Sequence, residues 1–338
     1  MSRLPFGKIP VDILNEVVFK NLGARRREVA LGPSAGIDGA VLNVGNRSLV
    51  TSMDPITGAI ERIGWLSLNI NANDVATFGV EPAFFLSCIM LPETAGKETV
   101  ETLTKQMDKA AKNLGIAIIG GHCEVTPQLK NAIVVGCAIG LTEKGEYVTA
   151  AGAQTGDRLI LTKSAGLEGT AILASDREQR AKRFLKVTEL RRAKTFYDRI
   201  SVVEDAITAF STGGVDAMHD PTEGGVAGGV NEIADASKLG VRVYEGKIPI
   251  EPETAMICQG FRIDPLQVIS SGALLIAAKP ELSDRVISRL KDKNIPAAEI
   301  GEFVRNKNRR TLVCTNGSEK TLPRPSSDHL WIALSDRR

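Results

Sequence analysis

Segments that read as strands alternate with segments that read as helices along the whole chain, and this alternation restricts the fold more than any other feature. In the first half, short apolar runs predict strands at 40–44, 48–52, 116–119 and 132–141, and helical spacing predicts helices at 11–22, 63–78 and 100–114. In the second half, strands are predicted at 158–162, 215–218, 241–244, 273–278 and 299–304, with helices at 202–210 and 282–290. Because both halves mix strands with helices, we predict two α/β sandwiches.

A segment rich in Gly, Thr and Ala at 142–157 separates two apolar strands near the middle of the chain. Such a composition is typical of a connection between folded units. A chain of 338 residues with 43% hydrophobic residues can bury a substantial core, and chains of this length usually divide into two domains. We therefore predict an N-terminal domain at 1–150 and a C-terminal domain at 151–338.

Composition argues against several classes of function. Lys and Arg number 42 against 40 Asp and Glu, so neither sign is in excess to bind nucleic acid or anionic lipid. The longest apolar stretch, 132–141, is about half the roughly 20 residues that a membrane span needs. The first residues interleave charges with apolar side chains, unlike an export signal, and the five cysteines lie far apart with no CxxC pair. We expect a cytoplasmic protein with no membrane or nucleic-acid partner.

The common nucleotide-binding signatures, GxxxxGK[ST] and a GxGxxG after a strand, are absent from the sequence. Polar residues beside small residues are other candidates for binding a nucleotide or a metal. Asp38 lies in the glycine-rich stretch 32–40, where backbone amides could approach an anion and a carboxylate could hold a metal. Asp54 follows the predicted strand 48–52, where α/β proteins place ligands. For each, an ordinary turn is the alternative.

Two further candidates lie in the first half. Asn73 and Asp74 belong to a helix otherwise apolar enough to be buried, and a metal or phosphate network would satisfy them. The alternative is a helix whose polar side faces water. The stretch Gly120-Gly121-His122-Cys123-Glu124 follows a predicted strand, but three consecutive side chains cannot easily bind one zinc ion.

In the second half, the stretch His219-Asp220-Pro221-Thr222-Glu223-Gly224 joins a predicted strand to a predicted helix. Thr222 is placed to cap that helix, and the glycines in its first turn would expose amides to an anionic group. Tight helix packing is an equally good reason for these glycines.

These stretches, taken in order, resemble the superfamily of aminoimidazole-ribonucleotide synthetase, HypE, selenophosphate synthetase and thiamine-monophosphate kinase. The similar motifs are GIDGA, MD at 53–54, NDVATFGVEP, GGHCEVTP and HDPTEGG, of which the last is most typical of HypE. GDRLILTKSAGLEGTAIL, IPIEPE and IGEFV are further matches. The resemblance therefore extends over nearly the whole chain.

The resemblance implies an α/β (α+β) fold, with an N-terminal mixed sheet that forms a barrel across a homodimer and a C-terminal α/β sandwich. It implies a cleft that binds ATP with Mg²⁺. The residues it assigns to metal are Asp38, Asp54 and Asp74; those it assigns to catalysis are Asp54, Asp74 and His122. Those it assigns to the nucleotide are Gly36, Asp38, Asn73, Gly120, Gly121, Glu124, Asp220, Thr222 and Gly224.

The implied function is ATP-dependent phosphorylation or activation of a small carbonyl, amide or phosphate acceptor, free or protein-bound. The alternatives are a kinase of the thiamine-monophosphate type and a nucleotide-binding regulatory protein without turnover. His122 stands where many relatives carry an acid, and Glu223 where the turn often has Arg. The sequence has no cysteine after Cys314, whereas HypE relatives end in one, so we do not expect cyanide-ligand synthesis by the HypE route.

Overall fold

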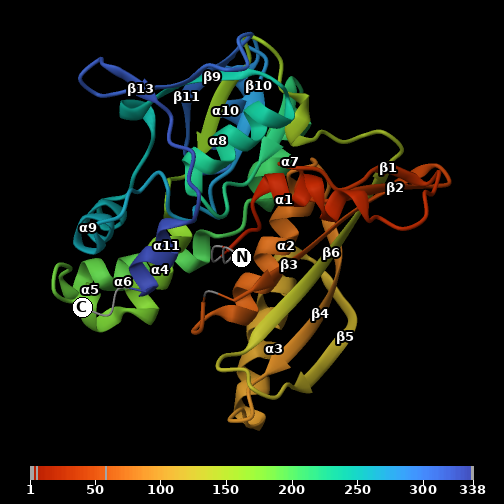
Figure 1. Ribbon diagram of the computed structural model, residues 1–338, viewed down its shortest axis with the longest axis vertical. Helices are drawn as coiled ribbons and strands as arrows, with labels where there is room; N and C mark the ends of the chain where they lie inside the picture. Colours follow the sequence, from red (N-terminus) through yellow and green to blue (C-terminus); the bar gives the residue numbers. More distant parts are fainter. Residues whose placement is uncertain (1–3, 5–6, 58, 336–338) are drawn as a thin grey trace.

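The protein is a mixed α/β molecule with two β-sheets, as predicted (Figure 1). The structure is a computed structural model, and it describes residues 4, 7–57 and 59–335. One sheet is built from the first half of the chain and the other from the second half. Among the described residues, no helix has the length and apolarity to cross a membrane.

The N-terminal sheet has six strands in the order β1-β2-β3-β6-β4-β5. Their bounds are β1 Val29–Leu31, β2 Ala40–Val44, β3 Arg47–Ile56, β4 Pro82–Leu91, β5 Ala117–Val125 and β6 Ile133–Glu143. Neighbouring strands are antiparallel except β4 and β5, which are parallel, so the sheet is mixed as predicted. β4 is absent from the predicted strands, and β3 and β5 continue well past their predicted ends.

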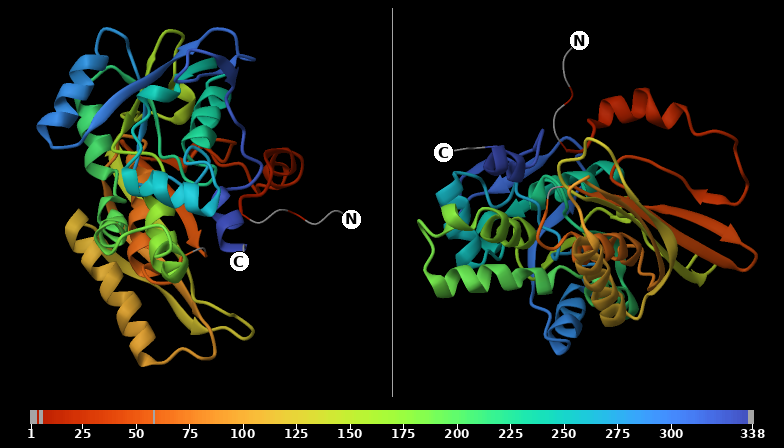
Figure 2. Two further views of the ribbon diagram at one scale, coloured as in Figure 1. Left: turned by 90° about the vertical axis from the view of Figure 1, so that its left-hand side faces the viewer. Right: turned by 90° about the horizontal axis from the view of Figure 1, so that it is seen from below.

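Two helices, α2 (Ile63–Ala76) and α3 (Lys97–Leu114), cover one face of this sheet (Figure 2). Every residue of α2 is buried, including its polar residues. The alternative of a helix whose polar side faces water is therefore wrong. The asparagine side chains of α2 bond to backbone instead: Asn71 Oδ1, for example, accepts from the backbone amide of Asp54 at 2.8 Å. α3 ends at Gly115, which has φ 69°, a conformation that favours glycine.

The C-terminal sheet has seven strands in the order β13-β12-β9-β11-β7-β10-β8. Their bounds are β7 Arg158–Thr162, β8 Val215–His219, β9 Gly240–Tyr244, β10 Leu275–Ala278, β11 Ala297–Val304, β12 Arg310–Val313 and β13 Glu319–Thr321. Successive residues of β7 enter different cores: Leu159 packs with α8 (Gly225–Ala236), and Ile160 packs with α7 (Val203–Thr212) and α10 (Ser283–Asp292). Helices on both faces confirm the predicted α/β sandwich.

A third group of helices joins the two halves. Its members are α4 Leu167–Asp176, α5 Glu178–Ala181, α6 Val187–Thr195, α9 Pro252–Phe261 and α11 His329–Ser335. Their apolar side chains belong to the same core cluster as those of α2 and β4. The indole of Trp65 on α2 donates to the carbonyl of Tyr197 at 2.7 Å, so polar contacts join the halves as well.

The remaining segments are short. The helix predicted at 11–22 is divided into α1 (Val11–Glu16) and the 3₁₀ helix η1 (Val18–Lys20), and neither buries a residue. Further 3₁₀ turns are η2 Ala150–Gly152, η3 Phe196–Arg199 and η4 Glu245–Lys247. In α11 the buried side chains are Leu330 and Ala333, so this helix is docked on the molecule.

Candidate functional site

Four aspartates from the two halves of the chain meet where the sheets approach each other. Asp38 precedes β2, Asp54 lies in β3, Asp74 lies in α2, and Asp220 follows β8. We call these four residues the acid cluster. Burial, and then the charges of the other three aspartates, raise the pKa of Asp74 well above its usual value. The predicted metal ligands therefore come together, although Asp54 lies within a strand and not past its end.

Side-chain hydroxyls tie the N-terminal members of the acid cluster to one another. Ser52 Oγ lies 2.6 Å from the carbonyl oxygen of Asp38 and 2.8 Å from Asp74 Oδ2. Thr77 Oγ1 lies 3.2 Å from Asp38 Oδ2. These contacts fix the positions of the carboxylates before any ligand binds.

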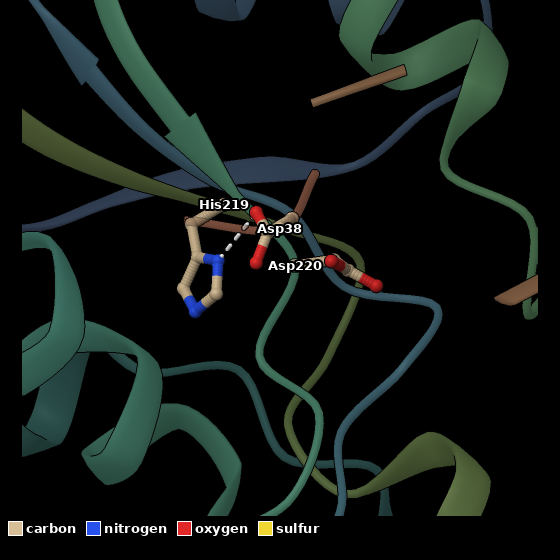
Figure 3. Close-up of side chains that lie close together, drawn as sticks. All are labelled: Asp38, His219 and Asp220. Carbon is tan, nitrogen blue, oxygen red and sulfur yellow. Dashed lines mark hydrogen bonds and ion pairs between the residues drawn. The ribbon is translucent and has the colours of Figure 1, made fainter. Parts of the chain in front are cut away.

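His219 lies buried between two carboxylates at the end of β8. Its Nδ1 is 2.8 Å from Asp38 Oδ2 (Figure 3). Its Nε2 is 2.7 Å from Glu232 Oε2 on α8. Burial disfavours an imidazolium, but the two carboxylates outweigh it and raise the pKa of His219 well above the usual value. His219 is therefore a buried cation that neutralises part of the acid cluster.

Asp220 is fully buried, and neither of its carboxylate oxygens has a hydrogen-bond partner among the residues that the structure describes. Burial, followed by the charge of Asp38, raises the pKa of Asp220 to about 7. Buried polar atoms in native proteins nearly always have partners. An unpartnered carboxylate beside other carboxylates is the arrangement that a bound cation would complete.

The donor set indicates which cation fits. Ligand atoms of Asp38, His219 and Asp220 lie within 4.8 Å of one another. However, both ring nitrogens of His219 already contact carboxylates, and a protonated imidazole cannot bind a metal. The available donors are therefore carboxylate oxygens, which suit Mg²⁺ better than Zn²⁺. The acid cluster could hold Mg²⁺.

A cleft of about 420 Å³ opens beside the acid cluster. Its walls include Lys8, Asp54, Thr222, Glu223 and the apolar side chains of Ile56, Ile70 and Ile269. A smaller cavity of about 70 Å³ shares Glu168, Glu223 and Trp331 with it. The larger volume falls in the usual range for small-molecule sites.

The stretch 120–124 does not reach this cleft. The strand register aligns Pro55 of β3 with Val135 of β6. Val135 is aligned in turn with Cys88 of β4, and Cys88 with His122 of β5. His122 therefore shares a sheet face with Pro55 and lies on the face opposite Asp54, with two strands between them. We expected His122, Glu124, Gly120 and Gly121 to flank the cleft that contains Asp54. In a single protomer these residues lie away from that cleft, so the expectation is wrong for one protomer.

Close packing of strands, and not a ligand, explains why glycine is needed at position 121. A Cβ on Gly121 would lie 2.0 Å from the carbonyl oxygen of Ser87 on β4. All residues of β5 are exposed, and the one polar contact of His122 Nε2 within the described part of the chain is with its neighbour Glu124, at 3.2 Å.

Three other predicted residues have contacts different from those expected. The side-chain Nδ2 of Asn73 donates to Ile200 O at 2.9 Å, and its Oδ1 accepts from Val202 N at 2.8 Å. The Asn73 side chain therefore joins the two halves and does not face a ligand. Gly224 caps α8 without help from a side chain, and its amide donates to Asp328 Oδ2 at 2.6 Å. That amide is therefore not free for a phosphate.

Thr222 does line the cleft, but it is not the helix cap. Its Oγ1 accepts a hydrogen bond from Lys8 Nζ at 3.0 Å. Gly36 has φ +76° and lies against the backbone of Glu232, where a Cβ would be 3.0 Å from the carbonyl oxygen. Gly36 therefore lets the loop that carries Asp38 approach α8.

Lys8, Glu168 and Glu232 were not assigned a role from the sequence. Glu168 is buried in the first turn of α4, its Oε2 has no partner among the described residues, and burial raises its pKa to about 7. Glu232 could have been found as an acid on the helix that follows the turn 219–224. Nothing near Lys8 in the sequence marks it as a cleft residue.

Comparison with known proteins agrees with this geometry. Residues 36–142 match the N-terminal domain of AIR synthase related proteins, and residues 154–313 match the C-terminal domain. A hydrogenase expression/formation protein of Methanocaldococcus jannaschii is 27% identical over 328 residues, 95% of each chain. The carbamoyl dehydratase HypE of Escherichia coli is 28% identical over 282 residues, 82% of this chain and 81% of that protein.

Solved structures show the same fold. HypE in a HypE–HypF complex has a TM-score of 0.76 at 22% identity, over 93% of this chain and 99% of that one. HypE in complex with ATP has a TM-score of 0.70 at 19% identity, over 95% and 96%. ThiL complexed with AMPPCP and TMP has a TM-score of 0.73 at 19% identity, over 96% and 99%. With both domains matched in order, the chain belongs to the AIR synthase related family.

Proposed function

We propose that this protein is an ATP- and Mg²⁺-dependent enzyme of the HypE type that phosphorylates or activates a small carbonyl, amide or phosphate acceptor. The observation that carries the proposal is the unpartnered carboxylate of Asp220, buried beside three aspartates from the other half of the chain. HypE and ThiL, which share the fold, have been solved with ATP and with AMPPCP, respectively.

In the proposed reaction the acid cluster would hold Mg²⁺, which supplies positive charge that offsets the charge on the phosphates. The protein's own groups position the reactants. Ser52 and Thr77 fix the carboxylates, and His219 limits the repulsion between Asp38 and Glu232. The bond between the γ-phosphoryl group of ATP and its bridging oxygen breaks, ADP leaves, and the phosphoryl group bonds to an oxygen of the acceptor. This transfer needs positioning more than covalent help.

Calorimetry of Mg²⁺-dependent ATP binding tests the proposal. Asp74→Asn and Asp54→Asn should each weaken binding more than tenfold without unfolding the protein, because an amide cannot replace a carboxylate in holding the cation. Asp157→Asn is the matched control, since Asp157 is equally buried but bonds to the backbone of Gln154 beside β7. Wild-type affinity in both cluster variants would overturn the assignment.

The fate of the phosphorylated acceptor distinguishes the proposed function from the alternative functions. A kinase of the thiamine-monophosphate type would release a stable phosphorylated product, whereas a HypE-like enzyme would use the phosphoryl group as a leaving group. A regulatory protein would bind ATP without turnover. Screening metabolites for ADP release and identifying the product by mass spectrometry separates these cases. The cocrystal of HypE with HypF also makes a protein-bound acceptor worth testing.

We further propose a homodimer that covers the outer face of the N-terminal sheet. The sheet face opposite α2 and α3 carries apolar side chains on neighbouring strands. Met53 of β3 is aligned with Cys137 of β6, and Cys137 is aligned with Leu86 of β4. Met53 is 63% exposed, and Leu141 on the same face is 44% exposed. An exposed apolar face of this kind is typical of an interface.

Sedimentation at micromolar concentration should give twice 36.2 kDa. Met53→Glu should shift the protein towards the monomer because it would place a charge in the interface. Val187→Glu is the matched control, since Val187 on α6 is also 63% exposed. A monomeric wild-type protein would rule out the dimer.

We expect the enzyme to act in a reducing compartment, the cytoplasm. All five cysteines are free, and disulfides are rare in cytoplasmic proteins.

A further inference from the structure

The cleft has far more negative than positive charge. Asp54, Glu168 and Glu223 line the cleft, and the charges of Glu232, Asp38 and Asp74 act on Lys8 within it. His219 is already engaged by two carboxylates. ATP would add further negative charge, of which one Mg²⁺ offsets only part. Among the described residues that line the cleft, Lys8 is the only lysine or arginine.

The backbone of the N-terminal segment is held against the turn that follows β8. The amide of Lys8 donates to Glu223 Oε2 at 2.8 Å. Gly7 has φ +91°, and a Cβ there would lie 2.3 Å from Glu223 Oε2 and 2.9 Å from Trp331 Nε1. Only glycine allows so close an approach. Glu223 thus binds the main chain and leaves the lysine side chain free to extend along the cleft.

The ammonium of Lys8 has capacity for a ligand. Its hydrogen bond to Thr222 Oγ1 uses one of three donors, and the structure gives it no other hydrogen bond within the described chain. Dehydration in the cleft disfavours its charge, but the surrounding carboxylates, Glu232 first among them, raise the pKa of Lys8 above its usual value. Lys8 is therefore positively charged at neutral pH.

We propose that Lys8 Nζ binds the terminal phosphates of ATP, and that Glu223 is the positioning residue that holds the N-terminal segment for this contact. The inference rests on the ATP-dependent function proposed above. It also explains how the turn functions with an acid at position 223: the cation comes from Lys8, and Glu223 holds the backbone that carries it. A lysine ammonium is a common phosphate ligand.

The test compares ATP, ADP and AMP, each with Mg²⁺, by calorimetry on the full chain. Lys8→Met should weaken ATP binding more than tenfold, ADP binding less, and AMP binding less than twofold, because only the terminal phosphates lose a contact. Lys8→Arg should recover most of the ATP affinity. Lys20→Met, in the exposed η1 helix of the same segment, should match the wild type.

Two outcomes would overturn the inference while leaving the proposed function intact. One is an ATP affinity for Lys8→Met within twofold of a wild-type protein that binds ATP. The other is an equal loss for ATP and AMP, which would mean that Lys8 acts through the shape of the cleft. If the wild-type protein binds no ATP with Mg²⁺, the proposed function fails, and this inference fails with it.

A double-variant cycle tests the role of Glu223. Glu223→Gln weakens the hold on the Lys8 amide and should reduce ATP affinity about two- to tenfold. If Glu223 acts through Lys8, the double variant should bind ATP no more weakly than Lys8→Met alone. Additive losses would show that Glu223 does not act through Lys8.

Discussion

Two histidines in similar stretches of sequence have opposite environments. His219 and His122 each lie beside an acid and a pair of glycines, at or near the end of a predicted strand. The side chain of His219 is 1% exposed and lies between Asp38 and Glu232. That of His122 is 65% exposed and contacts Glu124. Local composition therefore does not distinguish a site residue from a surface residue.

The difference comes from what each strand end faces. β8 ends against the loop that carries Asp38, so residues 219–220 meet carboxylates from the other half of the chain. β5 is an edge strand, and His122 points from the sheet face that carries no described helix. We expect the buried region around His219 to depend on its charges in ways that the exposed region around His122 does not.

The largest difference should appear on replacing each histidine by leucine. His219→Leu leaves two part-buried carboxylates without their cation and should cost about 3 kcal/mol of unfolding free energy, the lower end of the range for breaking a buried pair. His122→Leu leaves no buried charge without a partner, so its effect should be much smaller, less than about 1 kcal/mol, even where the proposed homodimer covers this sheet face. Urea denaturation measures both. Equal stabilities would mean that the carboxylates around His219 do not need its charge.

Mg²⁺ alone should stabilise the protein through the acid cluster. At about 100 times its dissociation constant, a ligand of the native state adds about 2.7 kcal/mol. The melting temperature should therefore rise with Mg²⁺ in the wild type and in His122→Ala. In Asp220→Asn, which removes the unpartnered carboxylate, the rise should be lost. An undiminished rise in Asp220→Asn would place the cation elsewhere.

The third effect concerns Glu168 and pH. Burial first, and then the charges of Asp328, Asp220 and Glu223, raise its pKa from 4.5 to about 7. The folded state therefore holds a proton that the unfolded state releases, and stability falls as pH rises from about 4.5 to about 7. Above that range the penalty is constant, on the order of 3 kcal/mol.

Glu168→Gln should remove this penalty, so the variant should be more stable than the wild type at pH 8 and nearly equal to it at pH 4.5. Thermal unfolding without Mg²⁺ measures the difference. Glu124→Gln, on the exposed strand β5, should give no such gain at pH 8, because the contacts of Thr126 and His122 lower the pKa of Glu124. A pH-independent effect of Glu168→Gln would contradict the assigned pKa.

Much of the fold could be predicted from the sequence because the apolar patterns of its elements are strong. α2 and α3 were identified by helical spacing, and Gly115 marked the end of α3. The ends of β3 and β5 were missed because each continues through residues, 53–56 and 120–125, that also suit turns. Turn-forming residues do not end a strand when neighbouring strands supply its hydrogen bonds.

The aspartates that a shared motif marks lie together in the structure, and their role as metal ligands stays a prediction. The groups around them were not predicted. Lys8 meets Thr222 across 214 positions of sequence, and His219 meets Asp38 across 181. Such contacts depend on how the two halves pack, which no local pattern encodes. The same limit explains the error at His122, whose distance from Asp54 follows from strand order.

One consequence follows from Asn73, the residue before the cluster member Asp74. Its side chain bonds to the backbone at both Ile200 and Val202, and the indole of Trp65 on the same helix bonds to Tyr197. Pulling the two sheets apart would break these buried bonds and split one continuous core. We therefore expect nucleotide exchange without rotation of one half against the other, and a single calorimetric unfolding transition for the whole chain.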